Sequence, residues 1–273
     1  MNNISFFCLT LNPEHEKKIK DLSYIPVGLG DKKFSDNFFT DKTGISISEK
    51  NSFYGEYTFH YWIWKNYIDK IKTEWVGFCQ YRKFFLYEKN YSNFLDFKDL
   101  QKAVLQNVSL EPHDYECILG DKFSVENFKF SKIFKHHLSD FLKDPVKLIN
   151  KKKRNLKFHF DLFHGKGNLE TAINFLDDLD KKDFTEYMSN NNHFNPHNMF
   201  ICKTNILKKY YEVVFPWLFK CEEKFGFKNL KGYGLKRIYG FLAERFLSYW
   251  FNKNFRVKEL PIFVKDLSDY KNL

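Results

Sequence analysis

Residues 41–85 read DKTGISISEKNSFYGEYTFHYWIWKNYIDKIKTEWVGFCQYRKFF, and this stretch decides the fold. A polar loop at 41–54 leads into an aromatic segment at 56–71, whose apolar side chains recur at the spacing of one helical face. We expect a helix there that is buried on most sides, with Ser52 as its N-cap. Because polar loops on a rigid scaffold often carry binding groups, the loop at 41–54 is a candidate binding element.

The apolar run WVGFC at residues 75–79 predicts a central strand that is buried on both faces. The charged corner Gln80-Tyr81-Arg82-Lys83 follows it directly. Ligands of open α/β sheets bind at the carboxyl ends of strands. Arg82 can offer a bidentate fork and Lys83 a point charge, and together they suit a diphosphate. A solvated strand end without a ligand is the alternative that the spacing leaves open.

The rest of the chain alternates between strand-like and helix-like segments, which predicts an α/β protein without a linker or an internal repeat. Expected strands lie at residues 4–10, 24–30, 115–120, 198–202 and 257–263, and the last of these is an edge strand. Expected helices lie at residues 13–22, 93–108, 124–142, 168–179, 206–225 and 235–252, and Pro216 should kink the fifth. Thr10 ends the first strand, where nucleotide contacts occur in α/β sheets.

Composition limits the partners and the compartment. The formal net charge of +10 over 273 residues favours anionic partners. The five cysteines form no CxxC pair, which argues against a disulfide framework or a zinc site and favours a reducing cytoplasm. No signal peptide and no membrane-spanning stretch are expected. The basic run at 151–154 predicts a solvated loop or, alternatively, docking on anionic lipid. Nucleic acid is not an expected partner, because no RNP-type motif is present.

Several blocks of the chain follow the pattern dDtGdNIseKNpyycElTalYWaWKN and then yiGlcHYRRYF. The matching residues are Asp41, Thr43, Gly44, Ile47, Ser48, Glu49, Lys50, Asn51, Glu56, Thr58, Tyr61, Trp62, Trp64, Lys65, Asn66, Gly77, Tyr81, Arg82 and Phe85. Two later blocks, HNMFICK at 197–203 and GFLAERFLSYWFNKNFRVKELPI at 240–262, match as well. The chain thereby resembles a bacterial family of capsule and exopolysaccharide glycosyltransferases, long catalogued as a domain of unknown function.

The chain departs from that family's pattern at the corner. Gln80 replaces the His of the family's His-Tyr-Arg-Arg motif, and Lys83 replaces the second Arg. The Asp that follows Gly44 in the family is missing. Gln80 cannot act as a base, although it can still hydrogen-bond a uracil or a sugar hydroxyl.

The resemblance implies a GT-A-like (Rossmann-like) mixed sheet flanked by helices, with a helical C-terminal part. It implies one glycosyltransferase domain over residues 1–273, with a nucleotide-sugar-binding part at 1–122 and an acceptor or helical part at 123–273. The expected reaction moves a sugar from a UDP-linked donor to a growing capsular, lipooligosaccharide or exopolysaccharide glycan on a lipid carrier. Cytoplasmic location at the inner membrane face, with peripheral contact, would follow. The alternative is a non-enzymatic basic scaffold of a polysaccharide assembly complex.

For the chemistry, we expect Arg82, with Lys83 or Lys50, to neutralise the leaving diphosphate without an obligatory metal. The sequence Asp178-Leu179-Asp180 resembles an Asp-X-Asp metal motif but lies late in an expected helix, which is the wrong context. Glu244 is the candidate base, with an ion pair to Arg245 or Arg237 as the alternative. Asp41 and Glu49 are weaker candidates for the base.

The resemblance and the strand ends together suggest a set of donor-binding residues. His164 belongs to this set because it matches a His that the family often has just before the helix at 168–179, and Gly165 and Gly167 after it suggest an open loop. Asn198 belongs because it begins a strand of the kind that lines sugar pockets. The full set is Thr10, Asp41, Thr43, Lys50, Asn51, Tyr81, Lys83, Asn198, His164 and Arg245.

Overall fold

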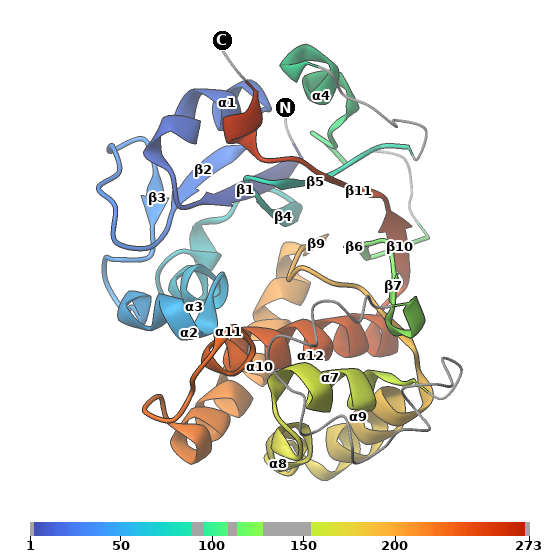
Figure 1. Ribbon diagram of the computed structural model, residues 1–273. Coiled ribbons are helices and arrows are strands. Elements are labelled where there is room, and N and C mark those ends of the chain that lie inside the picture. The colour runs from blue at the N-terminus through green and yellow to red at the C-terminus, as the bar shows by residue number, and fades with distance from the viewer. Residues whose placement is uncertain (1–2, 89–95, 109–113, 128–153, 271–273) are drawn as a thin grey trace. The chain divides into compact units, whose positions relative to one another are not determined.

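The computed structural model describes residues 3–88, 96–108, 114–127 and 154–270 (Figure 1). The chain divides into two compact units. Unit 1 comprises Met1–Asp121, His197–Val213 and Trp250–Leu273, and unit 2 comprises Lys122–Pro196 and Val214–Tyr249. The expected division into a donor-binding part at 1–122 and an acceptor part at 123–273 stays a prediction. The compact units do not follow it along the chain, because the segments 197–213 and 250–273 belong to unit 1.

Unit 1 is built around a mixed sheet, which confirms the predicted α/β class. Its nine described strands run in the order β10-β6-β9-β4-β1-β2-β3, and β5 pairs with both β4 and β11. The strands are β1 (Ile4–Thr10), β2 (Ile25–Gly28), β3 (Phe39–Thr40), β4 (Trp75–Gln80), β5 (Lys83–Phe85), β6 (Cys117–Gly120), β9 (Phe200–Lys203), β10 (Val257–Leu260) and β11 (Ile262–Val264). Strands β4, β1, β2 and β3 are mutually parallel, whereas β9 is antiparallel to β4 and β6.

The two central strands are buried because their sequences are almost wholly apolar. Every residue of β4 is buried, as a strand covered on both faces requires. Adjacent residues of β1 point to opposite faces. Phe6 lies 4.3 Å from the ring of Tyr24, while Phe7 stacks on Phe78 at 5.6 Å. Gly77 pairs with Phe6, and a Cβ at Gly77 would come within 2.2 Å of the Phe6 ring.

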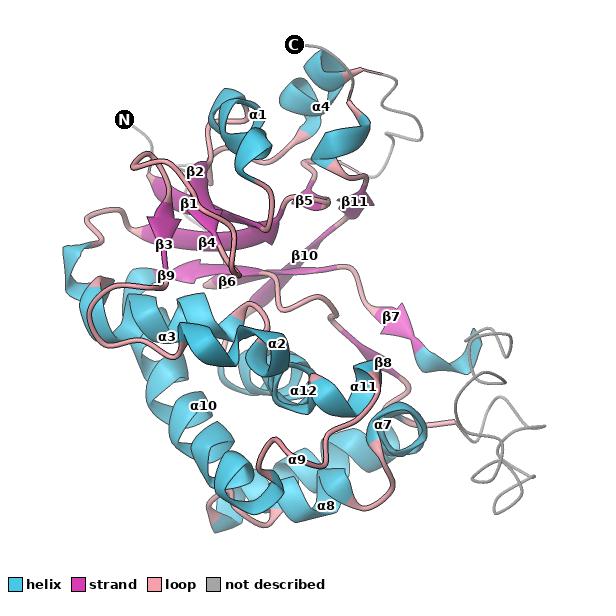
Figure 2. Cartoon of the chain, turned by 60° about the vertical axis from the view of Figure 1, so that its left-hand side comes forward, coloured by secondary structure: helices cyan, strands magenta, loops and turns pink. Residues whose placement is uncertain are grey.

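Helices cover both faces of this sheet (Figure 2). On one face, α1 (Glu16–Asp21) and α4 (Phe97–Ala103) contribute to the same core cluster as Phe6. On the other, α3 (Tyr57–Asn66) packs Phe59 against Phe7. The predicted cap is wrong, because Ser52 lies inside the separate short helix α2 (Asn51–Tyr54). Gly55, with a φ of 60°, separates α2 from α3.

Unit 2 is mainly helical. It contains α7 (Leu156–His164), α8 (Asn168–Ile173), α9 (Asp178–Asn190) and α11 (Tyr233–Lys236), with the small sheet of β7 (Phe123–Ser124) and β8 (His193–Phe194). It also holds parts of α10 (Thr204–Phe225) and α12 (Ile238–Asn254), in which the unit boundaries fall. The predicted helix at 124–142 lies mostly outside the described residues, and within them Val125–Asn127 forms a 3-10 turn.

Three sequence interpretations in unit 2 are wrong. Residues 159–164 are the second part of helix α7 and not a loop. Asp178-Leu179-Asp180 begins helix α9, where Asp177 is the N-cap and accepts a hydrogen bond from the Asp180 amide. Arg154, from the predicted solvated basic run, is 2% exposed and donates to the Glu126 carbonyl at 2.6 Å. The other residues of that run, 151–153, lie outside the described part.

All five cysteines are free and buried. Among the described residues, no helix is long and apolar enough to cross a membrane.

Candidate functional site

The parallel strands of unit 1 bring several of the predicted residues to one edge of the sheet. The register aligns Leu9 of β1 with Gln80 of β4, so Thr10 at the end of β1 lies beside Tyr81, which follows β4. The Tyr81 amide donates to the Leu9 carbonyl at 3.0 Å. Gly28 of β2 pairs with Thr40 of β3, so Asp41 follows β3 at the same edge. This carboxyl edge is the usual ligand position of open α/β sheets.

The corner between β4 and β5 presents Arg82 at this edge. Gln80 pairs with Lys83 across the turn. The Arg82 side chain is exposed, and its guanidinium carbon lies 5.6 Å from the centre of the Tyr81 ring. The backbone beneath it is fixed, because the carbonyls of Tyr81 and Arg82 accept hydrogen bonds from the amides of Leu267 and Lys265, each at 3.1 Å. An exposed cation on a fixed backbone is suited to an anionic ligand.

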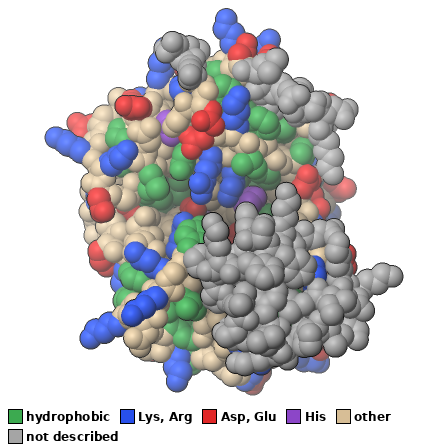
Figure 3. Space-filling model, in the orientation of Figure 1, with side chains coloured by type: hydrophobic (Ala, Val, Ile, Leu, Met, Phe, Trp, Pro, Cys, Tyr) green, Lys and Arg blue, Asp and Glu red, His purple; other side chains and the backbone are tan. Residues whose placement is uncertain are grey.

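Charge on the drawn face of the molecule is mixed. Figure 3 shows lysine and arginine side chains spread over this face with acidic side chains among them. The described side chains on this face therefore do not form one continuous positive patch, and local groups such as Arg82 must carry any specific attraction.

A polar chain of side chains continues from the corner. The Gln80 amide donates to Glu56 Oε1 at 2.8 Å and to the His197 carbonyl at 2.9 Å. The Lys83 ammonium lies 2.9 Å from His197 Nδ1, which must accept the hydrogen bond, because an ammonium only donates. The structure thus brings two predicted binding residues near each other, because Lys83 contacts His197 and Asn198 is the next residue in the chain.

The backbone at this point is strained. His197 has a φ of 86° and Asn198 a φ of 54°, and both are non-glycine residues in the left-handed region. Such a conformation costs about 1–2 kcal/mol for a residue such as His197 and less for asparagine, and left-handed residues are concentrated at functional sites. His197, through its strained backbone, and Glu56, through its hydrogen bond to Gln80, are candidate site residues that the sequence patterns did not predict. Both lie inside blocks that match the family pattern, and that was the available signal.

Asp41 is fully buried, and burial raises the pKa of its carboxyl group. The nearby Thr58 hydroxyl opposes this shift. The Asp41 carbonyl also accepts a hydrogen bond from the Ser46 hydroxyl, which holds the polar loop against the end of β3. Because Asp41 has no exposed surface, a ligand can reach its carboxyl group only if the loop at 41–54 moves.

Two predicted binding residues make contacts within the protein. The Trp62 indole donates to the Thr43 carbonyl at 2.7 Å. The Asn51 amide donates to the Gly55 carbonyl at 3.0 Å and to Thr58 Oγ1 at 3.1 Å. These bonds shape the loop from Asp41 onward. Burial raises the pKa of the Tyr61 hydroxyl, and half-buried Lys50 in the same loop partly opposes that shift.

Glu244 and Arg245 lie in unit 2, on α12. Arg245 is 2% exposed, and its Nη1 donates to Glu244 Oε2 at 2.5 Å. Its guanidinium also lies 3.6 Å from the Phe194 ring centre and 3.2 Å from His159 Nδ1. Burial lowers the pKa of Arg245, and the Glu244 carboxylate opposes that shift. Burial also lowers the pKa of His159. The structure therefore shows the ion pair that the sequence left open as the alternative to a catalytic role.

His164 is buried and ends helix α7. Its ring stacks on Phe241 at 4.1 Å, and its Nδ1 lies 3.1 Å from the Gly234 carbonyl. The loop expected around it begins only at Gly165, because His164 and the residues before it are helical.

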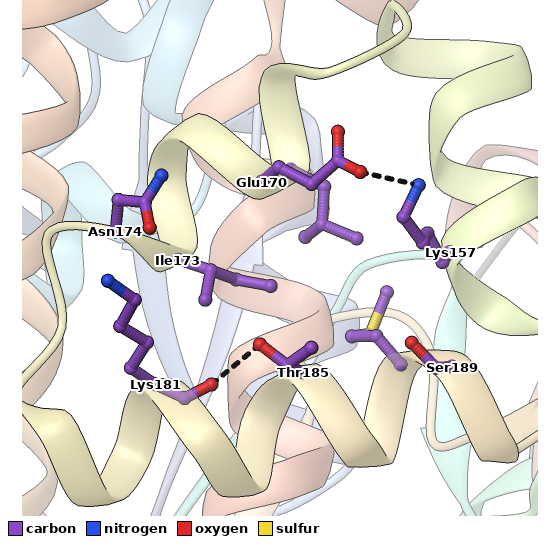
Figure 4. A pocket seen from close by; sticks show the side chains of 9 residues that line it. Lys157, Glu170, Ile173, Asn174, Lys181, Thr185 and Ser189 are labelled. Atoms are coloured by element: carbon purple, nitrogen blue, oxygen red, sulfur yellow. Dashed lines mark hydrogen bonds and ion pairs between the residues drawn. The ribbon is translucent and has the colours of Figure 1, made fainter.

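A small pocket lies between α7, α8 and α9 of unit 2 (Figure 4). Its volume is about 110 Å³, below the roughly 300 Å³ at which drug-sized ligand sites begin. Lys157 at its rim donates to Glu170 at 2.8 Å and to Asp161 at 3.1 Å, so its charge is compensated. This pocket is too small to be a nucleotide-sugar site.

The described residues contain no group of three or more His, Cys, Asp or Glu side chains that could hold a metal ion. Metal-free catalysis remains a prediction.

Comparison with known proteins relates the chain to others by sequence and by fold. A family model described as "Domain of unknown function (DUF4422)" matches residues 13–255. No curated protein matches the chain. A solved structure described as the WbbM bifunctional glycosyltransferase apo structure is similar, with a TM-score of 0.69, 21% sequence identity and coverage of 96% of this chain. The match spans 45% of that longer chain, and it shows a shared fold.

Proposed function

The chain belongs to the DUF4422 family, whose model matches residues 13–255, and from this premise we propose that it is a glycosyltransferase that uses a nucleotide-sugar donor. The shared fold with a bifunctional glycosyltransferase supports the proposal. The observation that carries it is the exposed Arg82 on a fixed corner at the carboxyl edge of the parallel strands, with Lys83 beside it.

In the proposed reaction, the bond between the sugar's anomeric carbon and the diphosphate oxygen breaks, and the acceptor hydroxyl forms the new bond. Arg82 and Lys83 bind the diphosphate as negative charge develops on it. Thr10, Tyr81, Asp41 and Asn198 contact the donor, which we propose to be UDP-linked. Thr43, Asn51 and Lys50 act through the loop that they shape.

The acceptor hydroxyl must lose a proton, and Glu244 stays the proposed base. Its ion pair with Arg245 would have to open for the carboxylate to accept the acceptor's proton. Glu244→Gln keeps the shape of the side chain and removes the base, and is a direct test of the role. Arg245 and His164 are proposed as supports of the acceptor side. We propose that the acceptor is a growing capsular, lipooligosaccharide or exopolysaccharide glycan on a lipid carrier.

The test is a thermal-shift screen with UDP-, GDP- and CMP-sugars, followed by transfer assays on the positive donor. Arg82→Ala should lower transfer at least about 100-fold with the fold intact, because it removes a group that stabilises the leaving charge. The matched control is Arg256→Ala, since Arg256 is also an exposed arginine of unit 1 but lies away from the corner, near Glu116 at 3.9 Å.

Absence of any nucleotide-sugar binding would favour the non-enzymatic scaffold instead. Equal loss of transfer in the two arginine variants would remove Arg82 from the mechanism. Transfer that persists in EDTA would support the metal-free proposal, and strict dependence on manganese would contradict it.

A further inference from the structure

A short segment late in the chain crosses the corner that carries Arg82. We call residues 265–270 the C-terminal strap. Its amides at Lys265 and Leu267 donate to the carbonyls of Arg82 and Tyr81, as described above. On its other side, the Lys18 ammonium donates to the Leu267 carbonyl at 2.8 Å. The strap therefore connects the backbone of the corner to helix α1.

His15 links this strap to the end of β1 and to the corner. Its side chain is buried, with 1% of the residue exposed. Its Nδ1 lies 2.9 Å from Thr10 Oγ1, and its Nε2 lies 2.8 Å from Ser268 Oγ in the strap. The ring centre of His15 lies 5.2 Å from that of Tyr81, at an angle of 34°. One imidazole thus contacts three separate parts of the carboxyl edge.

The contacts fit the neutral imidazole. Thr10 Oγ1 accepts a hydrogen bond from the Asn12 amide at 3.0 Å, so its own hydrogen can go to His15 Nδ1. The Nε2 hydrogen then goes to Ser268 Oγ, and both nitrogens are used. Burial lowers the pKa of His15 and favours this form, as do Lys18 and Lys32, whereas Asp266, 3.8 Å from Nε2, and Glu14 oppose the shift.

We propose that His15 is a positioning residue of the diphosphate site. It fixes the Tyr81 ring and the C-terminal strap, and through them the backbone from which Arg82 reaches the phosphates. The inference rests on the proposed role of Arg82 in donor binding. His15 itself touches no ligand in this scheme, and we expect its main effect at the phosphate end of the donor, because Tyr81 and the strap both lead to Arg82.

The experiment measures the affinity of the full chain for UDP, pyrophosphate and uridine in wild type, His15→Ala and Ser268→Ala. Ser268 is exposed, so its substitution removes the strap contact without opening the core. The matched control is Ser5→Ala, because Ser5 accepts one side-chain hydrogen bond, from Thr73 at 2.9 Å, in the amino-terminal half of β1.

We expect both site variants to bind UDP and pyrophosphate about tenfold more weakly, because a small displacement of a positioned group has effects of this order. Uridine affinity should stay within about twofold, and His15→Gln, which keeps a group able to reach Ser268, should restore part of the loss. A merely structural role would weaken UDP and uridine together.

The outcomes separate the two proposals. If Arg82→Ala abolishes UDP binding while His15→Ala and Ser268→Ala behave like Ser5→Ala, the positioning role is wrong and the proposed function stands. If both variants lose UDP and uridine affinity in parallel, the positioning role is also wrong. If the wild type binds neither UDP nor pyrophosphate and the nucleotide-sugar screen is also negative, both proposals fail.

Discussion

His197 has a strained backbone, and its side chain contacts Lys83. Substitutions can separate the cost of the backbone strain from the effect of losing the side-chain contact. Its φ of 86° is unfavourable for a residue with a Cβ and costs about 1–2 kcal/mol. Glycine adopts this conformation without that cost. The strained backbone holds the imidazole 2.9 Å from the Lys83 ammonium at the candidate site.

We therefore expect His197→Gly to be more stable than His197→Ala by about 1 kcal/mol, because both lose the ring and only alanine keeps the strain. Both variants should lose donor turnover to a similar extent. Urea unfolding and transfer assays on the two variants test this. Equal stabilities would mean that the backbone relaxes at this position, and full activity would remove His197 from the site.

His60 gives a prediction about acid stability. It is fully buried in unit 1, its Nδ1 lies 2.7 Å from the Tyr211 hydroxyl, and burial lowers its pKa from 6.5 to about 3. Below pH 6.5 the unfolded chain takes up a proton at His60 while the folded chain does not. Stability from the neutral ring is thus complete above pH 6.5 and is lost as the pH falls towards 3.

Between pH 7 and pH 4.5 this residue should lower the free energy of unfolding by about 2–3 kcal/mol. His60→Phe removes the titrating group, although it leaves the Tyr211 hydroxyl without this partner. The variant should be less stable than wild type at pH 7 and should lose less stability on acidification. Urea unfolding at both pH values measures the two slopes, and parallel slopes would contradict the prediction.

At the scale of the elements, β4 depends on the glycine at its centre. The Phe6 ring occupies the space over Gly77, so Gly77→Ala forces the ring or the strand to move. Overpacking of this kind costs about 1–3 kcal/mol in the free energy of unfolding. Urea unfolding should show this loss, and Phe6→Leu in the Gly77→Ala background should cost less than Phe6→Leu alone. Additive effects in this double-mutant cycle would exclude the clash.

The strands were the most predictable elements. The runs at 4–10 and 75–79 correspond to β1 and β4 because a short apolar run bounded by polar residues is typical of a buried strand in an α/β protein. The break between α2 and α3 was missed, since it depends on the positive φ of Gly55 and not on hydrophobic spacing. Helix α7 was missed because the glycines after His164 suggested a loop that begins only at Gly165.

The candidate site was predictable where it follows a strand. Arg82, Tyr81, Thr10 and Asp41 reach one edge because parallel strands share a direction. The roles of His15 and His197 could not be read from spacing, because their contacts join residues that lie far apart in the sequence. His15 reaches Ser268, and His197 reaches Lys83.

At the scale of the whole molecule, the net charge of +10 gives a prediction about ionic strength. Salt screens attraction between exposed charges, so affinity for UDP should fall severalfold as salt rises from low to high concentration. Uridine carries no charge, and its affinity should stay nearly constant. Titrations of both ligands at several salt concentrations measure the difference, and a UDP affinity that is independent of salt would argue against exposed cations as the phosphate ligands.

The interleaving of unit 1 along the chain has a consequence for synthesis. Strands β4 and β5 leave the ribosome long before residues 262–270. Those later residues supply β11, which pairs with β5, and the strap, which hydrogen-bonds the corner between β4 and β5. Contacts between distant segments form late, because closing a long loop costs entropy before it gains contacts. A nascent chain that has not yet reached residue 268 therefore holds Arg82 on an unfinished turn, and we expect the capacity to capture a donor to emerge only after the strap has been synthesised.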